Sequence, residues 1–225
     1  MAIDPAASDG ARFRTSFRAR VEPFARGLGR VGLTPNALTV IGFSIAAVGG
    51  ALAGAQWWVA AGVISGVGAA FDMLDGALAR ATGTTSRLGA FMDSVFDRWG
   101  EALLYVGIVI GCTQAGYELG AWLAAAAMAS AFMVSYTRAK SENLGFTPGT
   151  GMANVGLAPR EVRVAITTVG LILSGLAGGP SADSGATGSL LLAATLGLIT
   201  ILATVTAIQR ITHVMRQSKE QEIDR

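Results

Sequence analysis

The sequence predicts an all-α integral membrane protein with six transmembrane helices and an N-terminal amphipathic helix in the membrane interface. Its 225 residues are 52% hydrophobic and only 14% charged, which is too apolar for a soluble domain and too poor in charge for a disordered chain. Apolar runs of about 20 residues recur, and such a run is long enough to cross about 30 Å of hydrocarbon. Lysine and arginine gather in alternate connecting segments, as they do in membrane proteins of fixed orientation.

The first part of the chain, residues 1–30, is expected to form a cytoplasmic tail and a juxtamembrane amphipathic helix. Apolar side chains recur there at helical spacing, with arginines between them, which is typical of a helix whose cations reach lipid head groups. A soluble helix packed on the cytoplasmic face of the bundle is the alternative. The residues that carry the pattern are Phe13, Phe17, Val21, Phe24, Leu28, Arg12, Arg14, Arg18, Arg20, Arg26 and Arg30.

Residues 31–213 are expected to form the six-helix transmembrane domain, and residues 214–225 a cytoplasmic tail. Thr34 can cap the first helix, and Pro35 suits its first turn. Polar turns, glycine-rich loops and an interfacial pair of tryptophans separate the spans. The spans are expected at about 37–55, 57–70 with a continuation into an acidic motif, 89–110, 121–136, 159–176 and 189–208.

The distribution of positive charge predicts the orientation of these helices. Lysines and arginines lie in both terminal segments and in residues 80–87 and 138–163, whereas the loops around Gln56, Glu118 and Asp183 hold none. Positively charged loops stay in the cytoplasm, so both termini and the acidic motif should be cytoplasmic in a multi-pass protein of the cell (inner) membrane. The sequence has no basic block of the kind that binds nucleic acid, so nucleic acid is not an expected partner.

Four carboxylates lie between two apolar runs, at Asp72, Asp75, Asp93 and Asp97. An ionised carboxylate inside a membrane costs about 3 kcal/mol or more unless something compensates its charge. The first two lie three residues apart and the last two four apart, so each pair shares one helix face. Two such helices facing each other would bring the four together, and carboxylate oxygens suit Mg²⁺ or Mn²⁺. A polar seam that packs two helices together is the alternative.

Small residues accompany the carboxylates. Gly76 and Ala79 lie on or near the face of Asp72 and Asp75. Glycine within a helix is less favourable than alanine by about 1 kcal/mol, so we expect something to approach this backbone closely. A flat ring or a sugar is a candidate, and Arg80 offers a planar fork for a phosphate.

The pattern Asp-x2-Asp-Gly-x2-Ala-Arg-x8-Gly-x3-Asp-x3-Asp, from residue 72 to residue 97, resembles the signature of the CDP-alcohol phosphatidyltransferases. The resemblance implies a membrane enzyme, commonly a homodimer, in which the hydroxyl of an acceptor alcohol displaces CMP from a lipid such as CDP-diacylglycerol. It also implies two divalent ions, Mg²⁺ or Mn²⁺, held by the four aspartates, with Asp97 as the general base beside Asp93. The expected nucleotide contacts are Asn36, Thr39, Asp72, Gly76, Ala79 and Arg80.

Five cations flank the cytoplasmic ends of the later spans. Topology alone explains any single one, because lysine and arginine at helix ends extend to the interface. Arg160 and Arg163, however, lie three residues apart in the first turn of a helix, and a helix start already favours anions. A cationic pocket between helices suggests an acceptor that carries a phosphate. The five are Arg138, Lys140, Arg160, Arg163 and Arg210.

Further segments are similar to those of phosphatidylinositol phosphate synthases, a subfamily in which basic residues at these five positions surround the inositol phosphate. This resemblance ranks inositol 1-phosphate first as the acceptor and glycerol 3-phosphate second. A free alcohol such as serine or choline would leave the arginine cluster without a partner. The segments are residues 32–36, 135–142, 159–163 and 209–210.

An ion-coupled transporter is the alternative from another functional class, because intramembrane acidic residues also mark ion pathways. The small residues at fixed offsets argue against it, since an ion path has no need of them. The sequence also shows no internal repeat of the kind common in transporters. Glu101 continues the stripe of Asp93 and Asp97 by one helical turn, and we expect it to support the acidic site or to pair with Arg98 or another cation.

Overall fold

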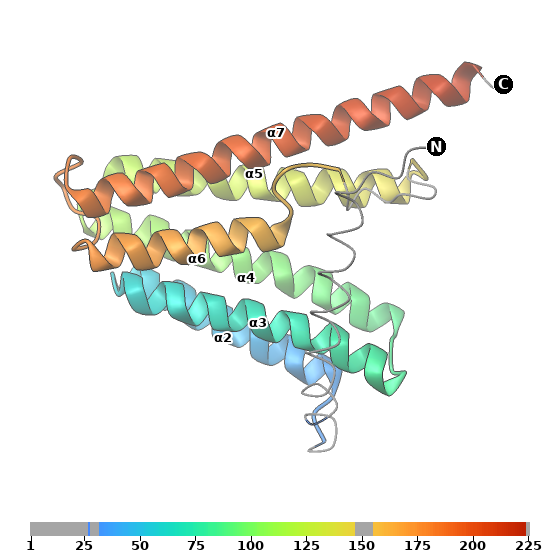
Figure 1. Cartoon of the computed structure of the whole chain (residues 1–225), viewed down its shortest axis with the longest axis horizontal. Helices are drawn as coiled ribbons and strands as arrows, with labels where there is room; N and C mark the ends of the chain where they lie inside the picture. Colours follow the sequence, from blue (N-terminus) through green and yellow to red (C-terminus); the bar gives the residue numbers. More distant parts are fainter. Residues whose placement is uncertain (1–26, 28–31, 147–154, 224–225) are drawn as a thin grey trace, which may run out of the picture. The chain divides into compact units, whose positions relative to one another are not determined.

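A computed structural model describes residue 27, residues 32–146 and residues 155–223 of the chain (Figure 1). The regular structure of this part is helical throughout. The amphipathic helix predicted within residues 1–30 lies outside the described residues, apart from Gly27. The helices are α2 (Pro35–Gly54), α3 (Trp58–Thr82), α4 (Arg87–Gln114), α5 (Glu118–Asn143), α6 (Arg160–Leu176) and α7 (Thr187–Ile223).

The six predicted helical segments all form helices, and four of them are long and apolar enough to cross a membrane: α2, α3, α5 and α7. The chain is therefore a multi-pass membrane protein with four clear candidate spans. Helix α4 contains Asp93, Asp97, Arg98 and Glu101, and these charges lower its hydropathy. Helix α6 has 17 residues, which rise only about 26 Å. The last helix runs through Ile223, so the tail predicted after residue 213 continues α7 for a further ten residues.

Local side chains and glycines set the helix ends where the sequence predicts them. The Thr34 hydroxyl accepts a hydrogen bond from the Ala37 amide at 3.2 Å, which confirms the predicted cap of α2. The Ser86 hydroxyl caps α4 in the same way by accepting from the Gly89 amide at 2.9 Å. After α3, the chain turns through Gly83 with a φ of 65°, a conformation that favours glycine.

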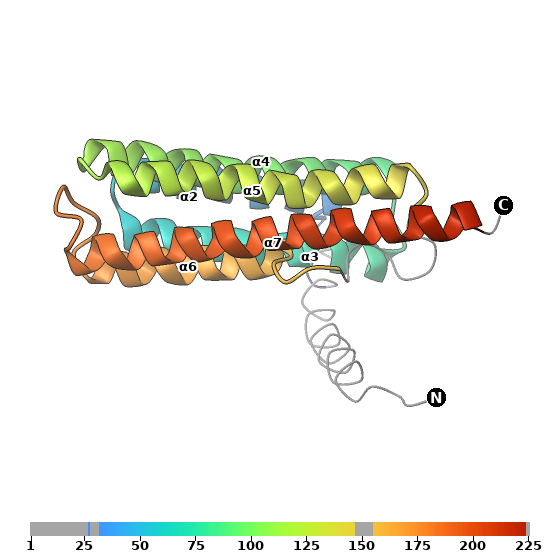
Figure 2. The same cartoon turned by 90° about the horizontal axis from the view of Figure 1, so that it is seen from above.

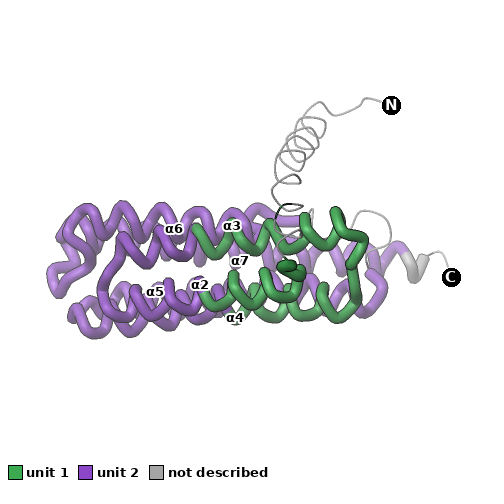
Figure 3. Tube along the Cα trace, turned by 90° about the horizontal axis from the view of Figure 1, so that it is seen from below, with its two compact units in different colours: residues 1–44, 67–99 green, residues 45–66, 100–225 purple. Residues whose placement is uncertain are grey.

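The described chain divides into two compact units, and the division falls within α2, α3 and α4 (Figure 3). Unit 1 comprises residues up to Ser44 together with Val67–Trp99, and it contains the acidic motif. Its core places Leu38 of α2 against Leu78 of α3, and the rings of Phe43 and Phe96 lie 4.8 Å apart. These contacts hold α2 against α3 and α4, the two helices that carry the motif.

Unit 2 comprises Ile45–Gly66 and Gly100–Arg225, and it holds the larger apolar core. Helix α7 packs along both α5 and α6, as Figures 1 and 2 show from two directions. Glycines let the other backbones approach closely: a Cβ added to Gly107 of α4 would collide with the Gly50 carbonyl oxygen of α2. Small residues at such crossings are the usual means of packing helices in membranes.

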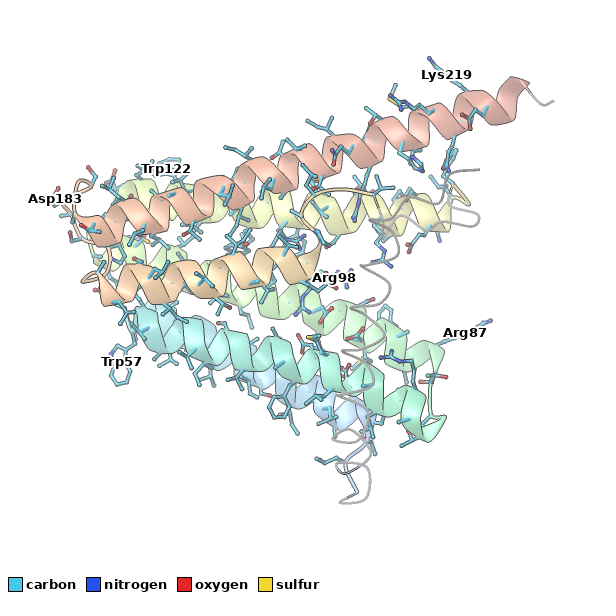
Figure 4. All side chains as sticks on the ribbon, viewed as in Figure 1. Trp57, Arg87, Arg98, Trp122, Asp183 and Lys219 are labelled. Atoms are coloured by element: carbon cyan, nitrogen blue, oxygen red, sulfur yellow. The ribbon has the colours of Figure 1, made fainter. Side chains whose placement is uncertain are left out.

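The two ends of unit 2 differ in their side chains. Figure 4 shows Trp57, Trp122 and Asp183 at one end and Lys219 at the opposite end. Both tryptophans are strongly exposed, as expected for aromatic side chains at a membrane interface.

Candidate active site

The most buried carboxylate of the acidic motif is Asp75, which is only 5% exposed. The hydroxyl of Thr39, on α2, donates a hydrogen bond of 2.6 Å to Asp75 Oδ2. Thr39 is also buried, so this bond fixes the orientation of the carboxylate on α3. The sequence predicts Thr39 as a nucleotide contact, whereas in the structure its hydroxyl orients an aspartate.

Two other carboxylates lie near Asp75. The negative charges of Asp93, on α4, and Asp72, one turn earlier on α3, both act on the Asp75 carboxylate. A Cβ added to Gly42 would collide with Asp72 Oδ1, so the bare backbone of α2 gives this carboxylate its space. The structure thus brings three of the four aspartates of the motif into one neighbourhood, from two helices.

The fourth aspartate, Asp97, lies one turn beyond Asp93 on α4 and is half-buried. Its Oδ2 is 3.9 Å from Nη1 of Arg98, and the same Nη1 donates to the Ser94 carbonyl oxygen at 2.7 Å. A positive charge therefore lies beside the residue that the family pattern implies as general base.

The carboxylates fit a hard divalent cation in their donor chemistry. Several carboxylate oxygens in one neighbourhood repel one another unless a cation offsets their charge, and Mg²⁺ and Mn²⁺ prefer such oxygen ligands. Within residues 32–146 and 155–223, no three carboxylate, imidazole or thiol side chains are already drawn together as they would be around an ion. The carboxylates of Asp72, Asp75 and Asp93 would have to come closer together to hold one.

The residues predicted to contact the nucleotide occupy the same unit. The guanidinium of Arg80 folds back along α3, and a Cβ on Gly76 would lie 3.2 Å from Arg80 Nη1. Ala79 is half-buried, and Arg80 is exposed. Asn36 is exposed near the start of α2, where its Oδ1 would lie 3.4 Å from a Cβ on Gly89. The Asn36 side chain therefore lies next to the glycine of the motif on α4.

In unit 2, three of the five predicted phosphate-binding cations are at least partly accessible. Arg138 Nε lies 2.9 Å from Glu142 Oε1 in an exposed pair on α5, and such pairs contribute little stability. Lys140 is exposed on the same helix, and Arg160 is half-buried as the first residue of α6. An anion can compete with Glu142 for the Arg138 guanidinium, because this pair is exposed.

Arg163, predicted as a phosphate ligand, is bound to protein atoms in the structure, and its role towards a phosphate stays a prediction. Its side chain is 1% exposed, and it donates to both oxygens of Glu101, from Nε at 2.8 Å and from Nη2 at 2.7 Å. Nη1 donates to the Ala158 carbonyl oxygen at 2.9 Å. A guanidinium buried this deeply needs a counterion, and Glu101 supplies it from α4. Glu101 is therefore a structural partner of Arg163, in line with the expected pairing to a cation.

Arg210 is also committed to protein atoms. Its side chain is 3% exposed, Nε donates to the Val155 carbonyl oxygen at 3.0 Å, and Nη1 donates to the Val134 carbonyl oxygen. The positive charges of Arg138 and Arg163 both act on the Arg210 guanidinium. The structure thus gathers three guanidiniums in unit 2, although two of them use their hydrogen bonds to hold the protein itself.

Sequence reasoning missed one residue of this region, Thr206 on α7. Its buried hydroxyl accepts hydrogen bonds from the Leu157 and Ala158 amides, each at 3.0 Å. Threonine within an apolar span usually bonds only to its own helix, as Thr200 does, so the sequence gives no sign of this contact.

Comparisons with known proteins identify the family to which the chain belongs. Residues 32–212 match the family model described as CDP-alcohol phosphatidyltransferase. The chain is 33% identical to the archaetidylinositol phosphate synthase of Pyrococcus horikoshii, over 89% of this chain and 93% of that protein. It is 31% identical to the phosphatidylinositol phosphate synthase of Cutibacterium acnes, over 91% of this chain and 96% of that protein.

Solved structures show the same fold. The phosphatidylinositol phosphate synthase of Mycobacterium tuberculosis with CDP-DAG bound superposes with a TM-score of 0.74 at 26% identity, covering 86% of this chain and 92% of that one. The same enzyme in complex with manganese and citrate gives a TM-score of 0.73, covering 87% and 88% of the two chains. The match to the family model spans the acidic motif, helices α2 to α6, and α7 as far as residue 212. The chain therefore belongs to the CDP-alcohol phosphatidyltransferase family and is an enzyme of that family.

Proposed function

We propose that this enzyme transfers the phosphatidyl group of CDP-diacylglycerol to a hydroxyl of inositol 1-phosphate and releases CMP. The observation that carries the proposal is the group of carboxylates around Asp75, within electrostatic reach of Asp72 and Asp93. Two relatives that match nearly the whole chain are synthases of inositol-phosphate lipids, and a solved enzyme of similar fold has CDP-DAG bound.

The acidic motif would hold the divalent ions. Asp72, Asp75 and Asp93 are the proposed ligands of two Mg²⁺ or Mn²⁺ ions, with Asp97 as a further ligand, and a related enzyme has been crystallised with manganese. Such ions supply charge neutralisation for a diphosphate and for the CMP that departs. Thr39 keeps one Asp75 oxygen oriented through its 2.6 Å hydrogen bond.

The nucleotide would lie against the small residues of α3. Gly76 and Ala79 leave the helix backbone accessible to a ring or sugar, provided that the Arg80 guanidinium moves from its position over Gly76 to a phosphate. Asn36 supplies a polar group at the start of α2 for the same ligand. Thr39 would affect the bound nucleotide indirectly, through its hydrogen bond to Asp75.

The chemical step is a displacement at phosphorus. The acceptor hydroxyl oxygen forms a bond to the phosphorus that carries the diacylglycerol, and the bond between that phosphorus and the CMP oxygen breaks. The hydroxyl proton passes to the Asp97 carboxylate, which acts as the general base. The Arg98 guanidinium lies beside this carboxylate, with Nη1 3.9 Å from Asp97 Oδ2.

The acceptor phosphate would be held by the cations of unit 2. Arg138, Lys140 and Arg160 are accessible and can donate hydrogen bonds to phosphate oxygens. Arg163 and Arg210 add positive charge, while their hydrogen bonds hold the surrounding backbone. Glycerol 3-phosphate offers the same phosphate and is the second candidate acceptor.

The enzyme would lie in the cell membrane with six spans, with both termini and the active site on the cytoplasmic side, and would form a homodimer. Exposed tryptophans at one end of unit 2 and Lys219 at the other support this orientation (Figure 4).

An acceptor panel tests the proposal. The purified protein in detergent receives CDP-diacylglycerol and Mg²⁺ or Mn²⁺ with inositol 1-phosphate, glycerol 3-phosphate, free inositol or serine, and CMP is measured. We expect CMP only with the metal and a phosphorylated acceptor, fastest with inositol 1-phosphate, and none from Asp75→Asn. CMP release that prefers glycerol 3-phosphate or a free alcohol would overturn the acceptor assignment.

A further inference from the structure

Residues Val155–Pro159, here called the strap, lead into the start of α6, and buried side chains hold their main chain in place. Four hydrogen bonds from three residues reach it: Thr206 accepts from the amides of Leu157 and Ala158, Arg163 donates to the Ala158 carbonyl, and Arg210 donates to the Val155 carbonyl. Main-chain groups of an irregular segment are usually bound by water or by their own turns, so this many buried anchors is unusual for a loop.

Thr206 makes the most specific of these contacts. Its hydroxyl donates to the Leu202 carbonyl oxygen at 2.7 Å and accepts from two amides, so its proton and both lone pairs are in use. Gly156 has a φ of 117°, and a Cβ there would collide with Thr206 Cγ2. A side chain at position 156 would therefore be strained and would also push the strap from its anchor.

The two arginines reinforce the anchor. Arg163 is fixed by both oxygens of Glu101, so its third nitrogen presents a rigid donor to Ala158. Arg210 also donates to Val134 of α5, and it therefore ties the strap to α5 as well as to α7.

The strap has two features that matter to a phosphorylated ligand. It leads directly into Arg160, the first residue of α6, through Pro159, whose side chain makes no capping hydrogen bond. It also forms one wall of a cavity of about 550 Å³, whose other wall is a face of α7. The polar residues on that face are Gln209, Thr212, His213 and Arg216.

We infer that Thr206 is a positioning residue for the phosphorylated acceptor, because it fixes the strap that places Arg160 and shapes this cavity. The inference rests on the proposed transfer to a polyol phosphate. Thr206 itself does not touch the acceptor, and its effect passes through the Leu157 and Ala158 amides. Loss of the hydroxyl should therefore weaken acceptor recognition and leave recognition of the CDP-lipid unchanged.

Three variants on α7 test this inference. Thr206→Val keeps the shape but removes the acceptor of both amides, Thr206→Ser keeps the hydroxyl, and Thr200→Val removes a hydroxyl that bonds only to its own helix. We expect Thr206→Val to raise the KM for inositol 1-phosphate at least tenfold, with the KM for CDP-diacylglycerol within twofold of wild type. Thr206→Ser should restore most of the acceptor affinity, and Thr200→Val should behave as wild type.

Hydrogen–deuterium exchange of a peptide covering residues 155–160 gives a readout that does not depend on activity. Faster exchange there in Thr206→Val, and not in Thr200→Val, supports the anchor. Unchanged exchange, or equal changes in the two KM values, overturns the inference. A wild-type enzyme that accepts no polyol phosphate refutes the proposed function and with it the acceptor role, while the exchange result still decides whether Thr206 anchors the strap.

Discussion

Replacing Glu101 by glutamine should destabilise the protein severely, although Glu101 lies outside the proposed catalytic residues. The variant keeps the size of the side chain but leaves the Arg163 guanidinium, 1% exposed, without its counterion. Breaking a buried ion pair by removing one partner costs about 3–5 kcal/mol. In a protein of this size each kcal/mol lowers Tm by about 2–4 °C, so we expect a decrease of about 6–20 °C.

Thermal unfolding in detergent measures this change, and the chain offers a matched control. Glu142→Gln breaks the exposed pair with Arg138, which joins the same two residue types at i,i+4 on the surface of one helix. This change should cost less than about 1 kcal/mol. A double variant, Glu101→Met with Arg163→Met, removes both buried charges and should recover a large part of the lost stability. A Tm for Glu101→Gln no lower than that of Glu142→Gln would refute the reasoning.

Three further predictions concern the acidic motif and the helix packing. Asp97→Asn should still bind the CDP-lipid, but its rate of CMP release should fall about 10²–10⁴-fold, because a general base contributes a factor of this size. An unchanged rate of CMP release would reject Asp97 as the general base. Thr39→Val should weaken Mn²⁺ binding about 10–100-fold, as loss of a carboxylate's hydrogen-bond partner does, whereas Thr39→Ser should not; a manganese titration followed by electron paramagnetic resonance compares them. Gly107→Ala should lower stability by about 1–3 kcal/mol, because its Cβ meets the Gly50 backbone, whereas Gly197→Ala, which meets nothing within 4 Å, should not; equal Tm values for the two contradict the close crossing.

The helices could be predicted from the sequence because their signals are local. Apolar runs, the Thr34 cap and the glycine after α3 each depend on residues within a few positions of one another. The shared face of Asp72 and Asp75 follows in the same way from helical periodicity. The number of membrane-spanning helices was harder to predict, because α4 carries charged residues and those charges lower its hydropathy.

The partners of the polar side chains could not be predicted, because they lie far apart in the chain. Thr39 and Asp75 are 36 residues apart, and Arg163 and Glu101 are 62 residues apart. In a sequence, a buried arginine that needs a carboxylate looks the same as an exposed arginine that marks the cytoplasmic side. Only tertiary packing separates Arg160, which remains accessible, from Arg163 in the same turn.

The five cations of unit 2 differ in how deeply their side chains are buried, and this difference separates their proposed roles. A cation that binds a ligand must keep donors available, whereas Arg163 already donates from all three nitrogens to Glu101 and Ala158, and Arg210 from two of its nitrogens to carbonyl oxygens. Their charges still act beyond their hydrogen bonds, as the effect of Arg163 on Arg210 shows. In a medium of low dielectric constant, charge acts over several ångströms, so these two fixed guanidiniums would attract the phosphate of the proposed acceptor. Because these two are already ordered, that attraction requires no loss of side-chain freedom when the phosphate binds.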